Sequence, residues 1–220
     1  MDTVATGPAL RSLTSCVDGR TAAQTSCIHV GRGETVFCAG DTGQAWRVVC
    51  GVVRLDRECD GEREFGGLAR VGDVIGAETL LLGRYTYTAV ALMPSVLEAW
   101  SHDQAPAAER EHKLLQALAT AERRMADVLA LRGGKAAARV RRLLGFLAGN
   151  GLRQPDPCVV MPRLRDIAEI TDLKVETVSR TISQLSQDGE IAALPRRQVR
   201  LHYAEAQAGV PDVTAGEAGR

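Results

Sequence analysis

Arg165-Asp-Ile-Ala-Glu-Ile-Thr-Asp-Leu-Lys-Val-Glu-Thr-Val-Ser-Arg-Thr-Ile-Ser-Gln-Leu-Ser-Gln-Asp-Gly189 has the pattern of a short helix, a tight turn and a second helix. Apolar residues recur at three- and four-residue steps through its second half, which is the spacing of one helix face. Gly189 follows the last polar residues, where a left-handed C-terminal cap is expected. Two helices joined this closely share one small core. The apolar positions are Ile167, Ala168 and Ile170 in the first helix, Leu173 in the turn, and Val175, Val178, Ile182 and Leu185 in the second helix.

The opposite face of the second predicted helix is polar. It carries Glu176, Ser179, Arg180 and Ser183. A carboxylate, a hydroxyl and a guanidinium within a turn and a half of helix suit the reading of base edges in a DNA major groove. The alternative is an ordinary helical hairpin with a solvated polar face, because helix-turn-helix geometry also occurs in proteins that bind no DNA.

The residues that follow favour the first interpretation. Ile191-Ala-Ala-Leu194, Pro195-Arg-Arg-Gln198 and Val199-Arg-Leu-His202 predict two short strands around a basic tip. Such a hairpin after a helix-turn-helix is a wing. The combination indicates a DNA-binding domain more specifically than either part alone.

These residues resemble a known family. Asp166-Ile167, Leu173, Val175-Glu-Thr-Val-Ser-Arg180, Leu185 and Asp188-Gly189 look like the winged-helix domain of the CRP/FNR superfamily of bacterial regulators. Glu176, Ser179 and Arg180 match the FNR and FixK branch, whose half-site is typically TTGAT. The resemblance implies that Arg180 contacts the guanine, Glu176 the base paired with that guanine or its neighbour, and Ser179 a thymine edge. Candidates for contacts with the DNA backbone are Arg165, Lys174, Thr177, Ser183, Arg196 and Arg197.

Lys174 departs from the family pattern, which usually has Thr or Ser capping the helix here. Lysine cannot accept the N-cap hydrogen bond, and it places positive charge at the positive end of the helix dipole. We expect a looser helix start, with the ammonium group in reach of a DNA phosphate.

Composition and charge agree with this interpretation. The chain has 220 residues, is 45% apolar and has a formal net charge of zero. The charge is uneven, because residues 135–203 carry 12 Lys and Arg against 7 Asp and Glu. A basic segment that coincides with the helix-turn-helix is what phosphate contacts require. The sequence predicts no signal peptide and no membrane span, so we expect a cytoplasmic protein whose six cysteines are reduced thiols.

The N-terminal half predicts an antiparallel β-roll. After a loosely ordered arm at residues 1–26, residues 27–106 contain β-rich runs separated by Gly and Asp turns. The runs are Glu34–Cys38, Trp46–Cys50, Gly51–Leu55 and Thr86–Leu92. Gly33–Asp41, Cys50–Arg54 and Gly72–Gly76 resemble the β-roll of the cyclic-nucleotide-binding fold, with glycines at turns that need positive φ. The predicted fold class is therefore α+β.

Residues 107–133 predict one long helix with two apolar faces. Leu115, Leu129 and Leu131 are expected to pack on the β-roll. The other face is expected to form a homodimer through a coiled-coil seam. The seam residues are Leu114, Leu118, Ala121, Met125 and Val128.

Gly133 and Gly134 interrupt this helix and predict a hinge between the sensor and the DNA-binding domain. Together they disfavour a helix interior by about 2 kcal/mol relative to alanine. The DNA-binding domain then spans residues 134–204, and residues 205–220 have the composition of a disordered tail.

The sensor does not match the cyclic-nucleotide members of the family. Glu78 corresponds to the family's ribose-binding glutamate, but Tyr85-Thr-Tyr-Thr-Ala89 stands where an Arg-Ser or Arg-Thr pair would hold the phosphate. Arg84 lies outside the expected frame. Without a cationic partner a cyclic phosphate binds poorly, so cyclic-nucleotide binding is not expected.

An FNR-type iron–sulfur cluster is not supported either. Cys16, Cys27, Cys38, Cys50, Cys59 and Cys158 include no Cys-x-x-Cys pair, and Leu97 stands at the fourth ligand's position. Most of these cysteines are expected to be small buried thiols. Cys16, Cys27, Cys38 and Cys158 are the candidates for a redox response. The cofactor, if any, is left open, and no metal-ligand motif is present.

The sequence therefore predicts a homodimeric transcription regulator of the FNR/FixK type that reads a TTGAT palindrome and responds to redox state or oxygen. The expected partners are double-stranded DNA, a second copy of the chain and RNA polymerase. Activation is the expected role, and the sequence alone leaves repression open. The alternative is a ligand-binding module whose winged helix mediates protein–protein contacts. An enzyme is not expected, because no nucleophile–base–acid set or phosphate loop is found.

Overall fold

The computed structural model describes residues 26–100, 107–149 and 157–202. Most of the predicted N-terminal arm, with Cys16, and all of the predicted tail lie outside these residues. The chain divides into two compact units, Met1–Ala126 and Asp127–Arg220. This boundary falls inside the long helix, ahead of Gly133 and Gly134.

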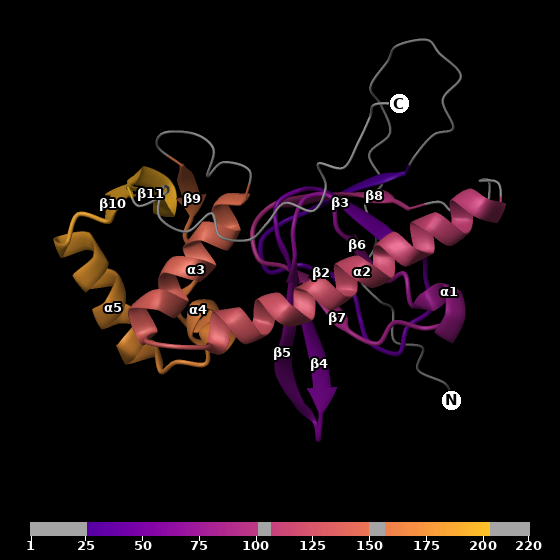
Figure 1. Ribbon diagram of the computed structural model, residues 1–220, viewed down its shortest axis with the longest axis horizontal. Helices are drawn as coiled ribbons and strands as arrows, with labels where there is room; N and C mark the ends of the chain where they lie inside the picture. Colours follow the sequence, from indigo (N-terminus) through magenta and orange to yellow (C-terminus); the bar gives the residue numbers. More distant parts are fainter. Residues whose placement is uncertain (1–25, 101–106, 150–156, 203–220) are drawn as a thin grey trace, which may run out of the picture. The chain divides into compact units, whose positions relative to one another are not determined.

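The first unit contains the expected antiparallel β-roll, made of two four-stranded sheets (Figure 1). One sheet has the strand order β1-β8-β3-β6 and the other β2-β7-β4-β5. The predicted β-rich runs contain β2, β3, the start of β4 and β7. The strands are β1 (Cys27–Val30), β2 (Thr35–Phe37), β3 (Trp46–Cys50), β4 (Val53–Cys59), β5 (Glu62–Ala69), β6 (Val74–Ile75), β7 (Thr88–Ala91) and β8 (Ser95–Ala99), with a short helix α1 (Thr79–Leu82) before β7.

The core of the roll forms around a pair of stacked rings. Phe37 and Tyr85 lie with their ring centroids 3.8 Å apart and nearly parallel. The Tyr85 hydroxyl donates to the Gln44 carbonyl at 2.7 Å, so the buried phenol is satisfied. Gly76 has φ 74°, and a Cβ there would lie 2.7 Å from the Tyr85 ring. Glycine is required here both by the backbone and by the close approach of the ring.

The long helix α2 (Ala107–Arg132) packs on the roll by a different face from the one the sequence predicts. Leu114 packs against a buried cluster with Val74, Trp100 and Ala117. Ala121 lines a cavity of the roll. Leu114 and Ala121, which the sequence assigns to a dimer seam, therefore contact the roll.

The face of α2 that is left uncovered carries the other apolar stripe. The side chains of Leu115, Leu118, Met125 and Leu129 are 64%, 67%, 61% and 76% exposed. The sequence assigns Leu118 and Met125 to the seam. It predicts that Leu115 and Leu129 pack on the roll, and their exposure shows that this prediction is wrong. These four residues, called the α2 stripe below, step by 3, 7 and 4 residues, as a helix seam does.

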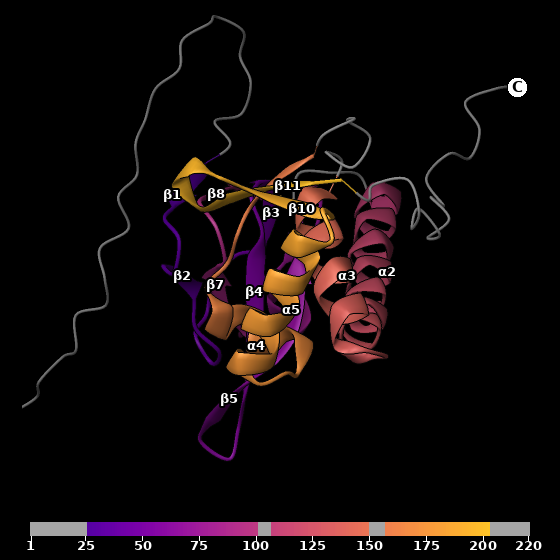
Figure 2. The same cartoon turned by 90° about the vertical axis from the view of Figure 1, so that its left-hand side faces the viewer.

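The second unit is a winged helix-turn-helix, as the predicted fold class requires (Figure 2). Its three helices share a core that contains Val140, Leu143, Ile167, Val178 and Leu185, each almost fully buried. The three-stranded wing sheet has the order β10-β11-β9, and its first strand in the chain, β9, was not predicted. The elements are α3 (Ala136–Ala148), β9 (Cys158–Val160), α4 (Leu164–Thr171), α5 (Val175–Gln187), β10 (Ile191–Leu194), the 3-10 turn η2 (Pro195–Arg197) and β11 (Gln198–Leu201).

Gly133 and Gly134 do separate two helices, α2 and α3, and Gly134 has φ 83°. Their carbonyl groups are hydrogen-bonded to arginines of α3. Arg142 donates to Gly133 at 2.9 Å, and Arg139 donates to Gly134 at 2.9 Å. Arg139 also donates to the carbonyls of Thr171 and Asp172 at the end of α4. A movement at these glycines would therefore have to break or shift these bonds.

Candidate nucleic-acid interface

The turn between α4 and α5 is tight because its backbone groups are satisfied locally. Asp172 adopts a left-handed conformation with φ 53°, which ends α4. The Leu173 N–H donates to the Ala168 carbonyl at 2.9 Å, and the Thr171 hydroxyl donates to the Ile167 carbonyl at 2.6 Å. Asparagine and aspartate tolerate this backbone region better than most residues. The turn thereby fixes the start of α5 relative to α4.

Helix α5 has one buried and one open face. Val178 and Leu185 are fully buried against the rest of the unit, and Ile182 is half-buried. Val175, which was predicted to join this core, is 40% exposed at the first position of the helix. The open face carries the residues predicted to read bases or to contact the backbone. Glu176, Ser179, Arg180 and Ser183 are all exposed.

Arg180 and Glu176 make no hydrogen bond or ion pair with any residue that the structure describes. They stand one helical turn apart, where a salt bridge between them would be feasible. Ser183 differs, because its hydroxyl donates to the Ser179 carbonyl at 3.1 Å within the helix. Two charged groups on an open helix face are thus available to a partner outside the subunit.

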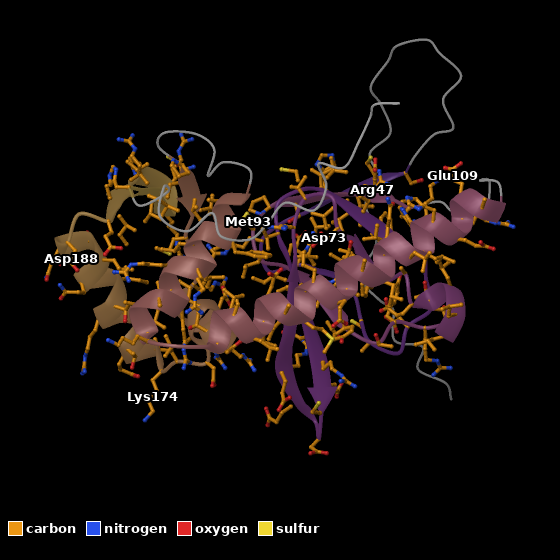
Figure 3. All side chains as sticks on the ribbon, in the orientation of Figure 1. Arg47, Asp73, Met93, Glu109, Lys174 and Asp188 are labelled. Carbon is orange, nitrogen blue, oxygen red and sulfur yellow. The ribbon has the colours of Figure 1, made fainter. Side chains whose placement is uncertain are left out.

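Lys174 stands at the N-cap of α5, as the sequence predicts. Its backbone is extended, with φ −72° and ψ 146°, and its side chain makes no capping hydrogen bond. Figure 3 shows the side chain pointing away from the ribbon. The N-terminus of α5 therefore carries an uncapped dipole and an exposed cation.

The other candidates for contacts with the DNA backbone lie on both sides of α5. Arg165 on α4 is 84% exposed and forms an ion pair with Glu169, at an N···O distance of 3.0 Å. Thr177 is half-buried. Arg196 and Arg197 are exposed at the tip of the wing, and each has φ 60°. A phosphate contact by Arg165 would compete with its own ion pair. The side chains of the two wing arginines make no hydrogen bond or ion pair among the described residues.

An ion pair fastens α3 to the end of α5. The Arg141 guanidinium donates to both carboxylate oxygens of Glu190, each at 2.5 Å. This hydrogen bonding holds the pKa of the Glu190 carboxyl below its usual value. The wing strand β10 begins at the next residue, so the pair fixes the wing to the helical core.

A cavity in the first unit brings together residues that sequence reasoning treated separately. Glu78 lines it, and its carboxylate accepts hydrogen bonds from the Thr86 N–H and hydroxyl at 3.2 Å each. Arg124 of α2 lines the same cavity, and the sequence analysis did not identify it. Arg84, in contrast, is exposed. The spacing of the sequence could have predicted this position. Arg124 follows Leu114, Ala117 and Ala121 at steps of three and four residues, which places it on the side of α2 that faces the roll.

Comparison with known proteins identifies the chain. A family model described as a cyclic nucleotide-binding domain matches residues 27–107. The nitrogen fixation regulation protein FixK of Bradyrhizobium diazoefficiens is 33% identical over 182 residues, which covers 76% of this chain and 74% of FixK. The transcriptional regulator LdrP of Thermus thermophilus is 31% identical over 185 residues, 81% of this chain and 94% of LdrP. The chain belongs to the CRP/FNR family of transcription regulators.

Solved structures agree with this assignment. A CRP-family transcriptional regulator from Thermus thermophilus has a TM-score of 0.65 and 28% identity, over 79% of this chain and 90% of that chain. FixK2 from Bradyrhizobium japonicum has a TM-score of 0.64 and 26% identity, over 83% of this chain and 94% of that chain. This CRP/FNR protein is therefore a DNA-binding regulator and not an enzyme.

The cysteines of this CRP/FNR regulator are more accessible than the sequence suggests. Cys27, Cys38, Cys50 and Cys158 are exposed and Cys59 is half-buried, so the expectation of buried thiols is wrong for the described cysteines. Among the residues the structure describes, no three or more His, Cys, Asp or Glu side chains gather as a metal site would need. In the same residues, no helix combines the length and the apolar character that crossing a bilayer demands.

Proposed function

We propose that this CRP/FNR regulator binds DNA as a homodimer and reads a TTGAT-type palindrome with α5. The observation that carries the proposal is the open face of α5. Glu176, Ser179 and Arg180 are exposed there, and neither charged group has a partner among the described residues. Arginine bonds guanine through two hydrogen bonds in the major groove, and carboxylates accept from cytosine, so this triplet suits a G·C pair and its neighbours.

The contacts that would position α5 are cationic and surround it. Lys174 stands at its N-terminus, and Arg196 and Arg197 extend from the wing. Phosphate contacts of this kind fix orientation without reading sequence. They also make affinity fall steeply with salt, because each phosphate neutralised releases counterions.

Dimerisation is assigned to the α2 stripe. Leu115, Leu118, Met125 and Leu129 are each more than 60% exposed, although they are large apolar side chains on one helix face. Burial of one such side chain contributes about 1.5–3 kcal/mol, so covering the stripe with a second copy is favourable. A homodimer carries two copies of α5, and in helix-turn-helix dimers the half-site centres lie roughly 34 Å apart, one turn of DNA.

Signal transmission would pass from α2 to α3 through Gly133 and Gly134. The arginine hydrogen bonds to their carbonyls hold one arrangement of α2 and α3, and a different set of bonds would hold another. RNA polymerase is the proposed partner at the promoter, with activation as the proposed outcome. Transcription in vitro from a promoter that carries the palindrome separates activation from repression.

A thiol response is supported most by Cys158. It is exposed, and in the wing sheet it stands directly opposite Arg200. Oxidation to a sulfinate would place a negative charge on the sheet that carries the DNA-facing wing. Cys27 and Cys38 are exposed candidates in the β-roll. Peroxide should lower the DNA affinity of the wild type but not of Cys158→Ser; equal losses in both would assign the effect to other residues.

The proposed function is tested by fluorescence anisotropy on a duplex with two inverted TTGAT half-sites, centred about ten base pairs apart. We expect binding that weakens steeply between low and moderate salt and that is much weaker for a duplex with both guanines replaced. Absence of duplex binding at any salt concentration would favour a ligand-binding module whose winged helix contacts another protein.

A further inference from the structure

The side chain of Arg139 on α3 joins two segments of the second unit that are far apart in the sequence. Its Nε–H donates to the Gly134 carbonyl at 2.9 Å. Its Nη1 group donates to the Thr171 carbonyl at 3.1 Å and to the Asp172 carbonyl at 3.2 Å. A guanidinium has several N–H donors fixed in one plane, so the first bond orients the group for the other two. This half-buried side chain thereby links the residue before the N-cap of α3 to the end of α4, which packs beside α3 (Figure 2).

The two carbonyls at the end of α4 need a donor from outside their own helix. The last carbonyls of a helix have no intrahelical N–H to accept from, and they form the negative end of its dipole. Because α4 has 8 residues, such carbonyls make up a large share of it. Asp172 then turns the chain out of the helix with φ 53°. A cation that donates to two adjacent carbonyls here stabilises both the helix end and the turn that follows.

The turn after α4 determines where α5 begins. Three residues separate the last residue of α4 from the first residue of α5. The Leu173 N–H closes this turn on the Ala168 carbonyl at 2.9 Å. The residues proposed to read bases lie close to the start of α5, and a binding group has to be held within about 0.5 Å of its working position. A shift of the Thr171 and Asp172 carbonyls would therefore displace Arg180 from the base it is proposed to read.

Arg142, on the same helix, holds a different part of the chain. Its guanidinium donates to the carbonyls of Ala130 and Gly133, at the end of α2. Among the described residues it makes no hydrogen bond to α4 or to the turn. The two arginines therefore offer a matched comparison, because both bind carbonyls beside α3 and only Arg139 also binds the end of α4.

We propose that Arg139 is a positioning residue for the reading of DNA. It holds the turn between α4 and α5, and with it the open face of α5, in the arrangement that meets the bases, and it does not itself touch DNA. The inference rests on the proposed function of α5 and adds to it a residue outside the interface. Without the bonds from Arg139 the reading arrangement becomes one of several, and the apparent affinity falls in proportion to its population.

The test compares Arg139→Lys with the wild-type full chain by fluorescence anisotropy on the TTGAT palindrome and on its guanine-substituted form. Lysine keeps the charge but lacks the planar group that reaches both segments. If the reading arrangement is then populated about one tenth of the time, affinity for the palindrome should fall about tenfold. Affinity for the substituted duplex should change by less than about twofold, because phosphate contacts do not depend on the bases. Affinities are expressed per folded molecule, with the folded fraction taken from urea unfolding.

Two further variants separate positioning from other roles. Arg142→Lys is the matched control and should keep the wild-type affinity for the palindrome, because its bonds lie at the end of α2. Arg139→Gln should keep the wild-type salt dependence, whereas loss of a phosphate contact would reduce the salt slope by about one. Exchange of the Leu173 amide proton with solvent, followed by NMR, should be faster in Arg139→Lys and unchanged in Arg142→Lys, because only the first variant loosens the turn.

Several results would overturn the inference. They are full palindrome affinity per folded molecule in Arg139→Lys, an equal loss on both duplexes, an equal loss in Arg142→Lys, unchanged Leu173 exchange, or a salt slope reduced by about one in Arg139→Gln. Each of these leaves the proposed function of α5 standing. A wild-type chain without preference for the palindrome would overturn the proposed function, and this inference with it, so the two failures are distinguishable.

Discussion

Both N···O distances between the Arg141 guanidinium and the Glu190 carboxylate are 2.5 Å, and the pair joins α3 to the end of α5. The two side chains are 28% and 24% exposed, so solvent screens the pair in part. The Glu190 pKa is lowered in the folded state, which means that the pair stabilises the fold above the usual carboxyl pKa. This stabilisation is lost as the pH falls through the lowered pKa.

Glu190→Gln is therefore expected to destabilise the second unit at neutral pH by about 1 kcal/mol. The difference from wild type should begin to shrink below the ordinary Glu pKa of about 4.3, where the carboxylate of the unfolded chain takes up a proton. It should vanish once the pH has fallen through the lowered pKa of the folded state. Urea unfolding of both proteins at neutral and acid pH measures this difference in the free energy of unfolding. Glu176→Gln, at an exposed carboxylate without a described partner, is the control. A destabilisation that did not change with pH would show that the charge of Glu190 is not involved.

Lys174→Ser should stabilise the second unit and weaken DNA binding. Serine accepts an N-cap hydrogen bond that lysine cannot, which stabilises a helix by about 1 kcal/mol. The same change removes a cation proposed to contact a phosphate, so the salt dependence of DNA binding should become shallower. Urea unfolding and anisotropy test the two effects separately. Lower stability of the variant would mean that Lys174 has a structural partner.

Arg196→Gly, at the tip of the wing, should also stabilise the second unit and weaken DNA binding. Arg196 has φ 60°, a conformation that costs a non-glycine residue about 1 kcal/mol and that glycine adopts freely. We expect higher stability, and a salt slope that is smaller by about one. Arg196→Lys is the matched control, since it should keep the slope and gain no stability. If glycine left DNA binding unchanged, the wing tip would not contact the phosphates.

The α2 stripe predicts which substitutions dissociate the dimer. Leu118→Glu should give a monomer in sedimentation velocity, because a charge would be buried in the seam. Leu81→Glu changes a leucine on α1 that is 83% exposed but lies outside the stripe, and it should leave the dimer intact. A wild-type chain that sediments as a monomer at every concentration would remove the basis for this prediction.

The helix-turn-helix could be predicted in detail because its signals are local. The apolar spacing of Val178 and Leu185, the turn before Lys174 and the polar face of α5 all follow from residues close in sequence. The register of α2 could not be predicted in the same way. Leu114 and Leu115 both begin stripes with helical spacing, and only the roll decides which stripe is covered.

The sensor cavity shows why some site residues stay hidden in a sequence. Arg124 lies in the wall because Val74 offers a carbonyl to it, and Val74 is 50 residues away. Arg84 is the arginine near Glu78 in sequence, but it is exposed. The exposure of the cysteines could not be predicted for a similar reason. Successive side chains of a strand point to opposite faces of the sheet, but the sequence does not say which face is exposed to solvent.

Arg180 is proposed to read the guanine of a TTGAT half-site. The most direct measurement is a double-mutant cycle by anisotropy, with wild type and Arg180→Ala against the palindrome and its guanine-substituted form. We predict that wild type prefers the guanine site and that Arg180→Ala loses about 1–3 kcal/mol of this preference while keeping salt-sensitive nonspecific binding. An Arg180→Ala variant with the full wild-type preference would contradict the claim.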